Sequence, residues 1–297
     1  MKTSIKILQY IILIYLIYYL YNNNYFNFEF FNSFFDKKVF FIVFLLSFTT
    51  VLLNAYRWLL ILKSHNLNIN FLDTFNLVYI GSFFNNILPG SYGGDLVRIY
   101  YITKFTKQNK LKIASTILLD RIYGLIGLII LGDIVFYFIC HEYNIIKFFV
   151  NLNLLIFLII IIFFISFKKL YFVRTYFDKM KIFFQIQKKT FLRCIFISCV
   201  LFFFVHMSVY IISTRFFEIE TSLSVVFFSN TLSTISSIIP ITPGGLGVSE
   251  LVYVKINQNL FSIYFQNLAN VIIYFRLCNI LTCLPSLFIF LSYKIKN

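Results

Sequence analysis

The chain has 297 residues, of which 60% are hydrophobic and 12% are charged, and its formal net charge is +15. Soluble domains contain about 25% charged residues, so this composition excludes an ordinary soluble enzyme or regulatory domain. Repeated apolar runs reach the ~20 residues that a helix needs to cross a bilayer core, and we therefore expect an all-α polytopic integral membrane protein.

Two segments carry most of the surplus positive charge. Residues 168–193 hold eight basic residues and one acid, and residues 98–112 hold five basic residues and no acid. The positive-inside rule places such segments in the cytoplasm, beside anionic lipid. We therefore expect a multi-pass protein of the cytoplasmic (inner or plasma) membrane, with a basic cytoplasmic loop at 168–191, both termini in the cytoplasm and no nucleic-acid partner.

Six apolar runs are long enough to be full spans, and they are Ile5–Tyr21, Val39–Leu62, Ile113–Ile139, Ile145–Phe167, Leu192–Thr214 and Asn267–Ser292. Two further apolar segments, Leu72–Leu88 and Leu223–Ile239, each end in a cluster of Pro and Gly. A short helical stretch follows each cluster, at Asp95–Phe105 and Val248–Ile256. We expect two re-entrant or broken helix pairs here, although eight spans result if both segments cross the membrane.

The two clusters share the pattern P-x-x-x-G-G, at Pro89–Gly94 and Pro240–Gly245. A small polar pair precedes each cluster at the same offset, and the pairs are Asn85-Asn86 and Ser236-Ser237. Three predicted spans separate the clusters, so the second should enter from the opposite face, as in transporters built from inverted repeats. Close packing of two helix breaks would also explain the glycines and prolines.

We therefore predict a single transmembrane domain over residues 1–297 that contains two inverted halves. The first half covers about 39–140 and includes the glycine motif at 89–95. The second half covers about 192–292 and includes the glycine motif at 240–246.

An anion-binding role is the functional interpretation of these motifs. A helix N-terminus offers unpaired N–H groups and a partial positive charge, and glycines allow a phosphate to approach closely. We therefore expect a lipid phosphate near the backbone amides that stand ahead of the two short helices, which are those of Gly93, Gly94, Gly244 and Gly245.

Two arginines within predicted spans add to this site. Arg121 and Arg276 each follow the glycine pair of their half by roughly thirty residues, and such buried charges cost about 2.5–3.5 kcal/mol on insertion scales. They are candidate phosphate ligands together with Arg98, or else members of purely structural ion pairs. Asp120 needs a partner on another element, for which Arg98 or Arg276 is available.

Other polar residues have simpler explanations. Asp95 near the start of a short helix is expected to make a capping or dipole interaction, whereas Glu250 is a candidate for proton coupling. Arg57 and Trp58 are expected at the membrane interface. The sequence has no nucleophile–base arrangement, metal cluster or nucleotide-binding loop, so we expect no catalytic residue, no metal and no cofactor.

Five segments carry a resemblance to a known family: RWLLILK, GSFFNNILPGSYGGDLVRIYYI, DRIYGLIGL, PITPGGLGVSE and YFRL. Together they resemble the lysylphosphatidylglycerol synthase transmembrane (flippase-like) family over roughly Val39 to Leu291. The resemblance implies relatives that move an aminoacylated phosphatidylglycerol between leaflets, and others encoded beside glycosyltransferases. The bifunctional synthases carry a soluble aminoacyltransferase domain after the membrane part, whereas this chain stops five residues after Ser292, so we expect no synthase activity.

The main hypothesis is a flippase-like protein that translocates or binds an anionic (phospho)lipid. Its lipid phosphate would meet the glycine amides and the arginines, and Asn85, Asn86, Ser236 and Ser237 would bond the rest of the headgroup. One alternative is a membrane transferase that acts on a polyprenyl-phosphate sugar or a phospholipid. Another is a scaffold that presents lipid to a separate synthase or glycosyltransferase.

Overall fold

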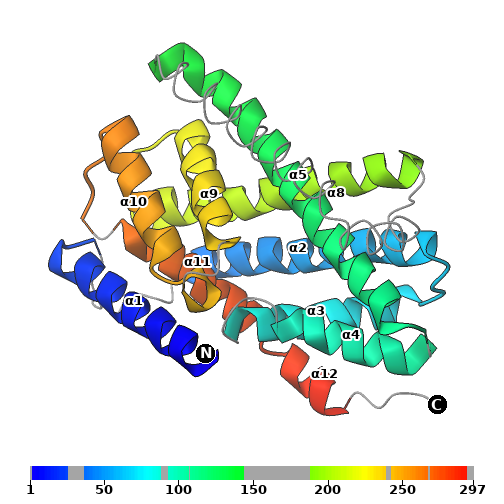
Figure 1. Ribbon diagram of the computed structural model, residues 1–297. Helices are drawn as coiled ribbons and strands as arrows, with labels where there is room; N and C mark the ends of the chain where they lie inside the picture. Colours follow the sequence, from blue (N-terminus) through cyan, green and yellow to red (C-terminus); the bar gives the residue numbers. More distant parts are fainter. Residues whose placement is uncertain are drawn as a thin grey trace, which may run out of the picture.

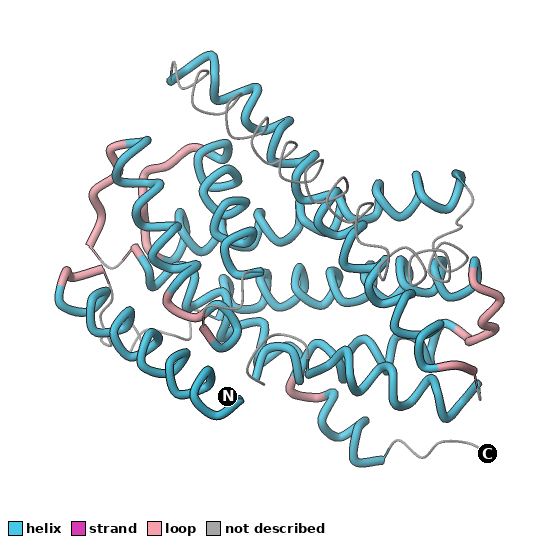
Figure 2. The backbone as a smooth tube through the Cα atoms, viewed as in Figure 1, coloured by secondary structure: helices cyan, strands magenta, loops and turns pink. Residues whose placement is uncertain are grey.

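The computed structural model describes residues 2–25, 37–87, 93–106, 108–143, 188–238, 242–266 and 268–292. Within these ranges the regular structure is entirely helical, and short loops join most of the helices (Figures 1 and 2). The predicted span Ile145–Phe167 and most of the basic loop at 168–191 lie outside the described residues.

The helices follow in chain order, and their bounds are α1 (Lys2–Asn22), α2 (Lys37–Ser64), α3 (Phe71–Ile87), α4 (Gly93–Thr106), α5 (Lys110–Tyr143), α8 (Lys188–Ile211) with its π-helical continuation η2 (Ile212–Phe216), α9 (Leu223–Ile238), the 3-10 turn η3 (Pro243–Gly245), α10 (Val248–Phe261), α11 (Ala269–Cys283) and α12 (Ser286–Ser292).

Four helical stretches of the described residues are long and apolar enough to cross a membrane, and they are Lys37–Ser64, Lys110–Tyr137, Lys188–Phe216 and Ala269–Ser292. The prediction of a polytopic all-α protein is therefore confirmed. The last predicted span is not one continuous helix, because Leu284 and Pro285 form a turn between α11 and α12. Proline has no backbone N–H and disrupts a helix interior, which explains the break.

The two Pro-Gly clusters each lie between two helices that pack against each other. Helix α3 contacts α4, and α9 contacts α10. Figure 1 shows α2 and α8 side by side across the molecule, with the α3–α4 hairpin starting from one end and the α9–α10 hairpin from the other. Helix α3 contacts the turn η3, so the described ends of the two hairpins come together, whereas residues 88–92 and 239–241 of the two clusters lie outside the described residues.

The element lengths repeat between the two halves. Helix α2 has 28 residues and α8 with η2 has 29, α3 has 17 and α9 has 16, and α4 and α10 each have 14. Helices α5 and α11 follow at the same place in the order. This agreement puts equivalent positions of the two halves in register, from the first long helix to the end of the hairpin.

Apolar side chains form two large buried clusters, and each contains residues of both halves. One buried cluster gathers around Trp58 on α2 and Leu77 on α3, with contributions from α4 and α5. A second cluster gathers around Tyr253 on α10 and Tyr274 on α11, together with residues of α1, α2, α8 and η2. Burial of a large side chain contributes about 1.5–3 kcal/mol, so these clusters fix each hairpin against its long helices.

The α3–α4 hairpin depends on a close backbone approach. The amide of Gly94 donates a hydrogen bond to Asn85 Oδ1 at 2.8 Å, which links the tip of α3 to the first turn of α4. A Cβ atom on Gly94 would overlap the backbone carbonyl of Gly81, so only glycine fits at this crossing.

We predict that Gly94→Ala destabilises the protein by about 3 kcal/mol or more, at the upper end of overpacking effects, because backbone atoms must move. The matched control is Gly244→Ala. A Cβ there meets nothing within 4 Å, and only its positive φ of 63° opposes the change, at a cost of about 1–2 kcal/mol. Thermal unfolding in detergent measures both effects, and equal losses would contradict the close approach.

Candidate functional site

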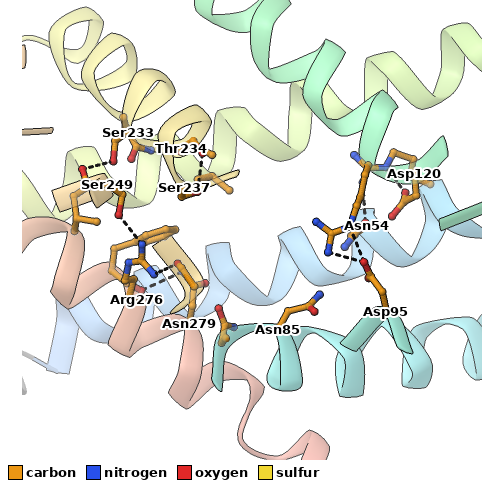
Figure 3. Close-up of a pocket in the computed structure, with 18 of the residues that line it drawn as sticks. Asn54, Asn85, Asp95, Asp120, Ser233, Thr234, Ser237, Ser249, Arg276 and Asn279 are labelled. Carbon is orange, nitrogen blue, oxygen red and sulfur yellow. Dashed lines mark hydrogen bonds and ion pairs between the residues drawn. The ribbon is translucent and has the colours of Figure 1, made fainter. Parts of the chain in front are cut away.

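A cavity of about 440 Å³ lies beside the last turns of α3 and α9. Small-molecule sites typically have volumes of about 300–1,000 Å³, so the space suits a lipid headgroup. Both halves contribute to its lining, and Figure 3 shows many of the side chains. The lining includes Asn54, Arg57, Asn85, Asn86, Asp95, Arg98, Asp120 and Arg121 from the first half, and Asn230, Ser233, Thr234, Ser237, Gly244, Ser249, Arg276 and Asn279 from the second.

One ion pair occurs at the equivalent place in each half. Asp95 and Arg121 lie 2.6 Å apart, and Glu250 and Arg276 lie 2.8 Å apart. Each acid is the third residue of its short helix, each arginine is on the following long helix, and 26 residues separate the partners in both cases. A carboxylate in the first turn also interacts favourably with the helix dipole, so this position suits an acid in both halves.

The pair in the second half also fastens the loop ahead of α10. Glu250 accepts a hydrogen bond from the amide of Gly247, which caps the helix. Arg276 donates to the carbonyl oxygens of Gly244 and Gly245 at 2.9 and 3.3 Å, and to Ser249 Oγ at 2.6 Å. Arg276 therefore connects α11 to the loop that the glycines form.

The first half has a further charged cluster that ties three helices together. Arg57 on α2 lies 2.7 Å from Asp120 on α5, and Arg98 on α4 lies 3.6 Å from the other oxygen of the same carboxylate. Arg57 also donates to Ser198 on α8 at 2.8 Å. The Arg98 guanidinium lies 5.1 Å from the ring centroid of Trp58, a distance typical of a cation–π contact.

This cluster corrects one expectation and decides another. Arg57 and Trp58 are buried, not interfacial, because α5 and α8 pack against this part of α2 and bond both side chains. The alternatives left for Asp120 were Arg98 and Arg276. Arg98 is one of its partners, whereas Arg276 pairs with Glu250. Arg57 is the partner that the sequence analysis missed.

Protein groups already bind several of the glycine amides. The Gly94 amide donates to Asn85 Oδ1, and the Gly245 amide donates to the Thr242 carbonyl at 3.1 Å. Helices α4 and α10 begin at Gly93 and Val248, so Gly93 opens its helix, whereas Gly244 and Gly245 belong to the preceding turn. The Gly94 and Gly245 amides already have protein partners, so the positive charge at the cavity comes from the guanidinium groups of its arginines.

The two predicted polar pairs, Asn85-Asn86 and Ser236-Ser237, differ in how they contribute to the cavity. Asn85, Asn86 and Ser237 line the cavity, whereas Ser236 is not part of its lining. The Ser236 hydroxyl donates to the Ser233 carbonyl at 2.7 Å, and the Ser237 hydroxyl donates to the Thr234 carbonyl at the same distance.

The sequence analysis missed a polar stripe on α9. Asn230, Ser233, Thr234 and Ser237 have the spacing i, i+3, i+4 and i+7, which puts them on one face of a helix. The spacing i, i+3 also joins Asn54 to Arg57, and Arg276 to Asn279. This periodicity of polar residues inside apolar runs is the signal that could have identified them.

The contacts of His206 indicate a structural role. It is fully buried on α8, and its two ring nitrogens lie 2.7 Å from Asn230 Nδ2 and 3.1 Å from Thr231 Oγ1. These contacts hold α9 against α8 behind the cavity lining.

Comparison with known proteins decides the family. The family model described as the lysylphosphatidylglycerol synthase transmembrane region matches residues 7–285. The chain belongs to this family. Its apolar helices and this membership together establish a multi-pass membrane protein.

Two relatives share shorter stretches with this member of the lysylphosphatidylglycerol synthase transmembrane family. A UPF0104 membrane protein of Pyrococcus horikoshii is 35% identical over 83 residues, which are 27% of this chain and 25% of that protein. A UPF0104 membrane protein of Methanocaldococcus jannaschii is 38% identical over 74 residues, which are 25% of this chain and 22% of that protein. The matched stretches therefore span about a quarter of these relatives' length.

We predict that Asp120→Asn strongly destabilises the fold. The substitution leaves the buried Arg57 and Arg98 without a counter-charge, and breaking a buried ion pair typically costs about 3–5 kcal/mol. Arg215→Gln removes a cation from an exposed position of η2 and should change stability by no more than about 0.5 kcal/mol. Thermal unfolding in detergent compares the two, and an Asp120→Asn protein as stable as wild type would contradict the structural role of the cluster.

Proposed function

We propose that the protein binds the headgroup of an anionic phospholipid in this cavity and moves the lipid between the leaflets of the cytoplasmic membrane. The observation that carries the proposal is the charge of the cavity. Four arginines and two aspartates line it, and Glu250 pairs with one of those arginines. The described residues of the site thus hold one cation more than carboxylates, and a phosphodiester with one negative charge would balance it.

The arrangement of the two equivalent pairs supports phosphate binding. The side chains of Arg121 and Arg276 are 37% and 25% exposed, whereas those of their partners Asp95 and Glu250 are 11% and 2% exposed. The buried carboxylates therefore orient the guanidinium groups, and part of each guanidinium surface stays accessible to a ligand. A planar guanidinium can bind phosphate through two parallel hydrogen bonds.

Arg98 supports the same site from deeper in the fold. Its side chain lines the cavity and is buried, and its Nε atom has no hydrogen-bond partner in the part of the chain that the structure describes. A buried donor without a partner costs about 1–3 kcal/mol, and a ligand oxygen would remove that cost.

The hairpins suggest how the lipid moves. They approach the cavity from opposite ends of the long helices, and their breaks occupy equivalent positions of the two halves (Figure 1). We propose that they are re-entrant and that the two halves expose the cavity to each leaflet in turn, as in transporters with broken helices near the midplane. The driving force for net transport is then a lipid gradient, an ion gradient, or the consumption of the lipid by a partner synthase or glycosyltransferase.

A scrambling assay tests this function. Liposomes with the purified full chain and a fluorescent phosphatidylglycerol, labelled on its acyl chain, are treated with a membrane-impermeant reductant that bleaches only the outer leaflet. We expect wild type to expose the inner-leaflet lipid, and Arg121→Gln to slow this exposure by about tenfold or more, because a charge-assisted hydrogen bond contributes about 1.5–3 kcal/mol. Arg215→Gln should have no effect.

Two comparisons make the result decisive. The pair of substitutions Asp95→Asn and Arg121→Gln leaves no carboxylate unpaired, so slow scrambling by a stable double variant reports the missing guanidinium and not misfolding. A wild-type rate equal to that of protein-free liposomes would contradict translocation. Labelled lipid that is chemically altered during the assay would favour the transferase alternative.

A further inference from the structure

The cavity has two chemically different walls. The first-half wall consists of Asn54, Arg57, Asn85, Asn86, Asp95, Arg98, Asp120 and Arg121, and the polar residues of the second-half wall are Asn230, Ser233, Thr234, Ser237, Ser249, Arg276 and Asn279. In Figure 3, Asn54, Asp95 and Asp120 lie on one side of the cavity and Thr234, Ser237 and Asn279 lie on the other, with Asn85 between them at the bottom of the view.

Charge is concentrated on the first-half wall. It holds three arginines against two aspartates, whereas the single arginine of the second-half wall is neutralised by Glu250. When the halves are aligned on their equivalent ion pairs, Arg98 corresponds to Tyr253 and Asp120 corresponds to Phe275. The second half therefore repeats the backbone of the first but not its extra charges, and a phosphate is attracted to the first-half wall.

Neutral hydrogen-bonding groups cover the second-half wall. The Asn279 amide nitrogen donates to the Phe275 carbonyl at 3.1 Å, which leaves the amide oxygen to accept from a ligand. The hydroxyls of Ser233 and Ser237 donate to the carbonyls of Ser249 and Thr234, so their lone pairs remain available as acceptors. Such groups are suited to bind hydroxyls of a ligand.

An amine is a poor ligand for the same cavity. Each of the three carboxylates at the site, Asp95, Asp120 and Glu250, already lies between 2.6 and 3.6 Å from an arginine nitrogen. An ammonium group would therefore meet an excess of positive charge among the described residues and no uncommitted carboxylate. Burying a charge without a counter-charge is costly, so amine-bearing headgroups are disfavoured.

We propose that the lipid has an amine-free headgroup rich in hydroxyls, such as a phosphoglycerol or a sugar phosphate. Its phosphate lies against Arg98 and Arg121 on the first-half wall, and its hydroxyls bond Thr234, Ser237 and Asn279 on the second-half wall. This inference rests on the proposed function and assigns the substrate class of that site. It separates this chain's substrate from the aminoacylated lipid in the family description.

Three lipids with different headgroups test the assignment on the detergent-solubilised full chain. Phosphatidylmethanol has the same charge as phosphatidylglycerol but no hydroxyl, and phosphatidylethanolamine has an ammonium group. Native mass spectrometry gives the bound fraction of each at equal concentration. We expect phosphatidylglycerol to bind about tenfold more tightly than either of the others, as the loss of one or two buried hydrogen bonds would produce.

Variants of the second-half wall connect this preference to its residues. In the double variant Thr234→Val and Asn279→Leu, the bound fractions of phosphatidylglycerol and phosphatidylmethanol should become nearly equal. The matched control is Thr214→Val, whose hydroxyl bonds the Tyr210 carbonyl and which lies outside the cavity lining. Asn279→Asp adds a carboxylate to the neutral wall and should shift the preference toward phosphatidylethanolamine by about tenfold, as a charge-assisted bond would.

The outcomes separate the two proposals. Binding of no lipid by the folded wild type would overturn the proposed function and this inference together. Equal binding of phosphatidylglycerol and phosphatidylmethanol, or tighter binding of phosphatidylethanolamine, would overturn the hydroxyl-rich headgroup and leave anionic lipid binding in place. A preference for phosphatidylglycerol that the wall variants remove would support the inference.

Discussion

The organisation of this protein depends on one constraint: a charge among apolar helices must have a counter-charge. Asp120 meets this requirement by binding Arg57 and Arg98, which joins α2, α4 and α5 at one point. Glu250 and Arg276 do the same for α10 and α11. The first turns of α4 and α10 are therefore held by ion pairs whose members, apart from Glu250, also line the cavity, so stability and the proposed binding site share residues.

The repeated order of helices explains the shape of the cavity, and the differences between the two halves explain its chemistry. The equivalent pairs Asp95–Arg121 and Glu250–Arg276 have the same separation along the chain and hold two guanidinium groups at the cavity from opposite halves. The buried cluster around Asp120 has no charged counterpart, because Phe275 and Tyr253 occupy the equivalent positions of Asp120 and Arg98. A symmetric scaffold thus carries an asymmetric binding surface, which can orient a ligand with two different ends.

Sequence reasoning located the element types and the glycine motifs better than it located the site. Helices α2 to α5 were readable because long apolar runs and Pro-Gly breaks have strong local signals. Arg57 was misplaced because a basic residue beside Trp near the end of an apolar run is typical of an interface, and only the packing of α5 and α8 against α2 shows that it is buried. The stripe on α9 was overlooked because serine and threonine are frequent at helix–helix interfaces in membranes, where packing alone explains them.

By itself the sequence determined the membrane environment, the helical class, the positions of the two breaks and the presence of buried arginines, since these follow from composition and local pattern. The tertiary structure decided which charges meet. Asp120 pairs with Arg57, 63 positions away, and Arg57 also bonds Ser198, 141 positions away. Ion pairs across helices depend on packing and helix rotation, which no local pattern encodes. The structure alone also showed that protein groups bind the Gly94 and Gly245 amides, and that guanidinium groups face the cavity.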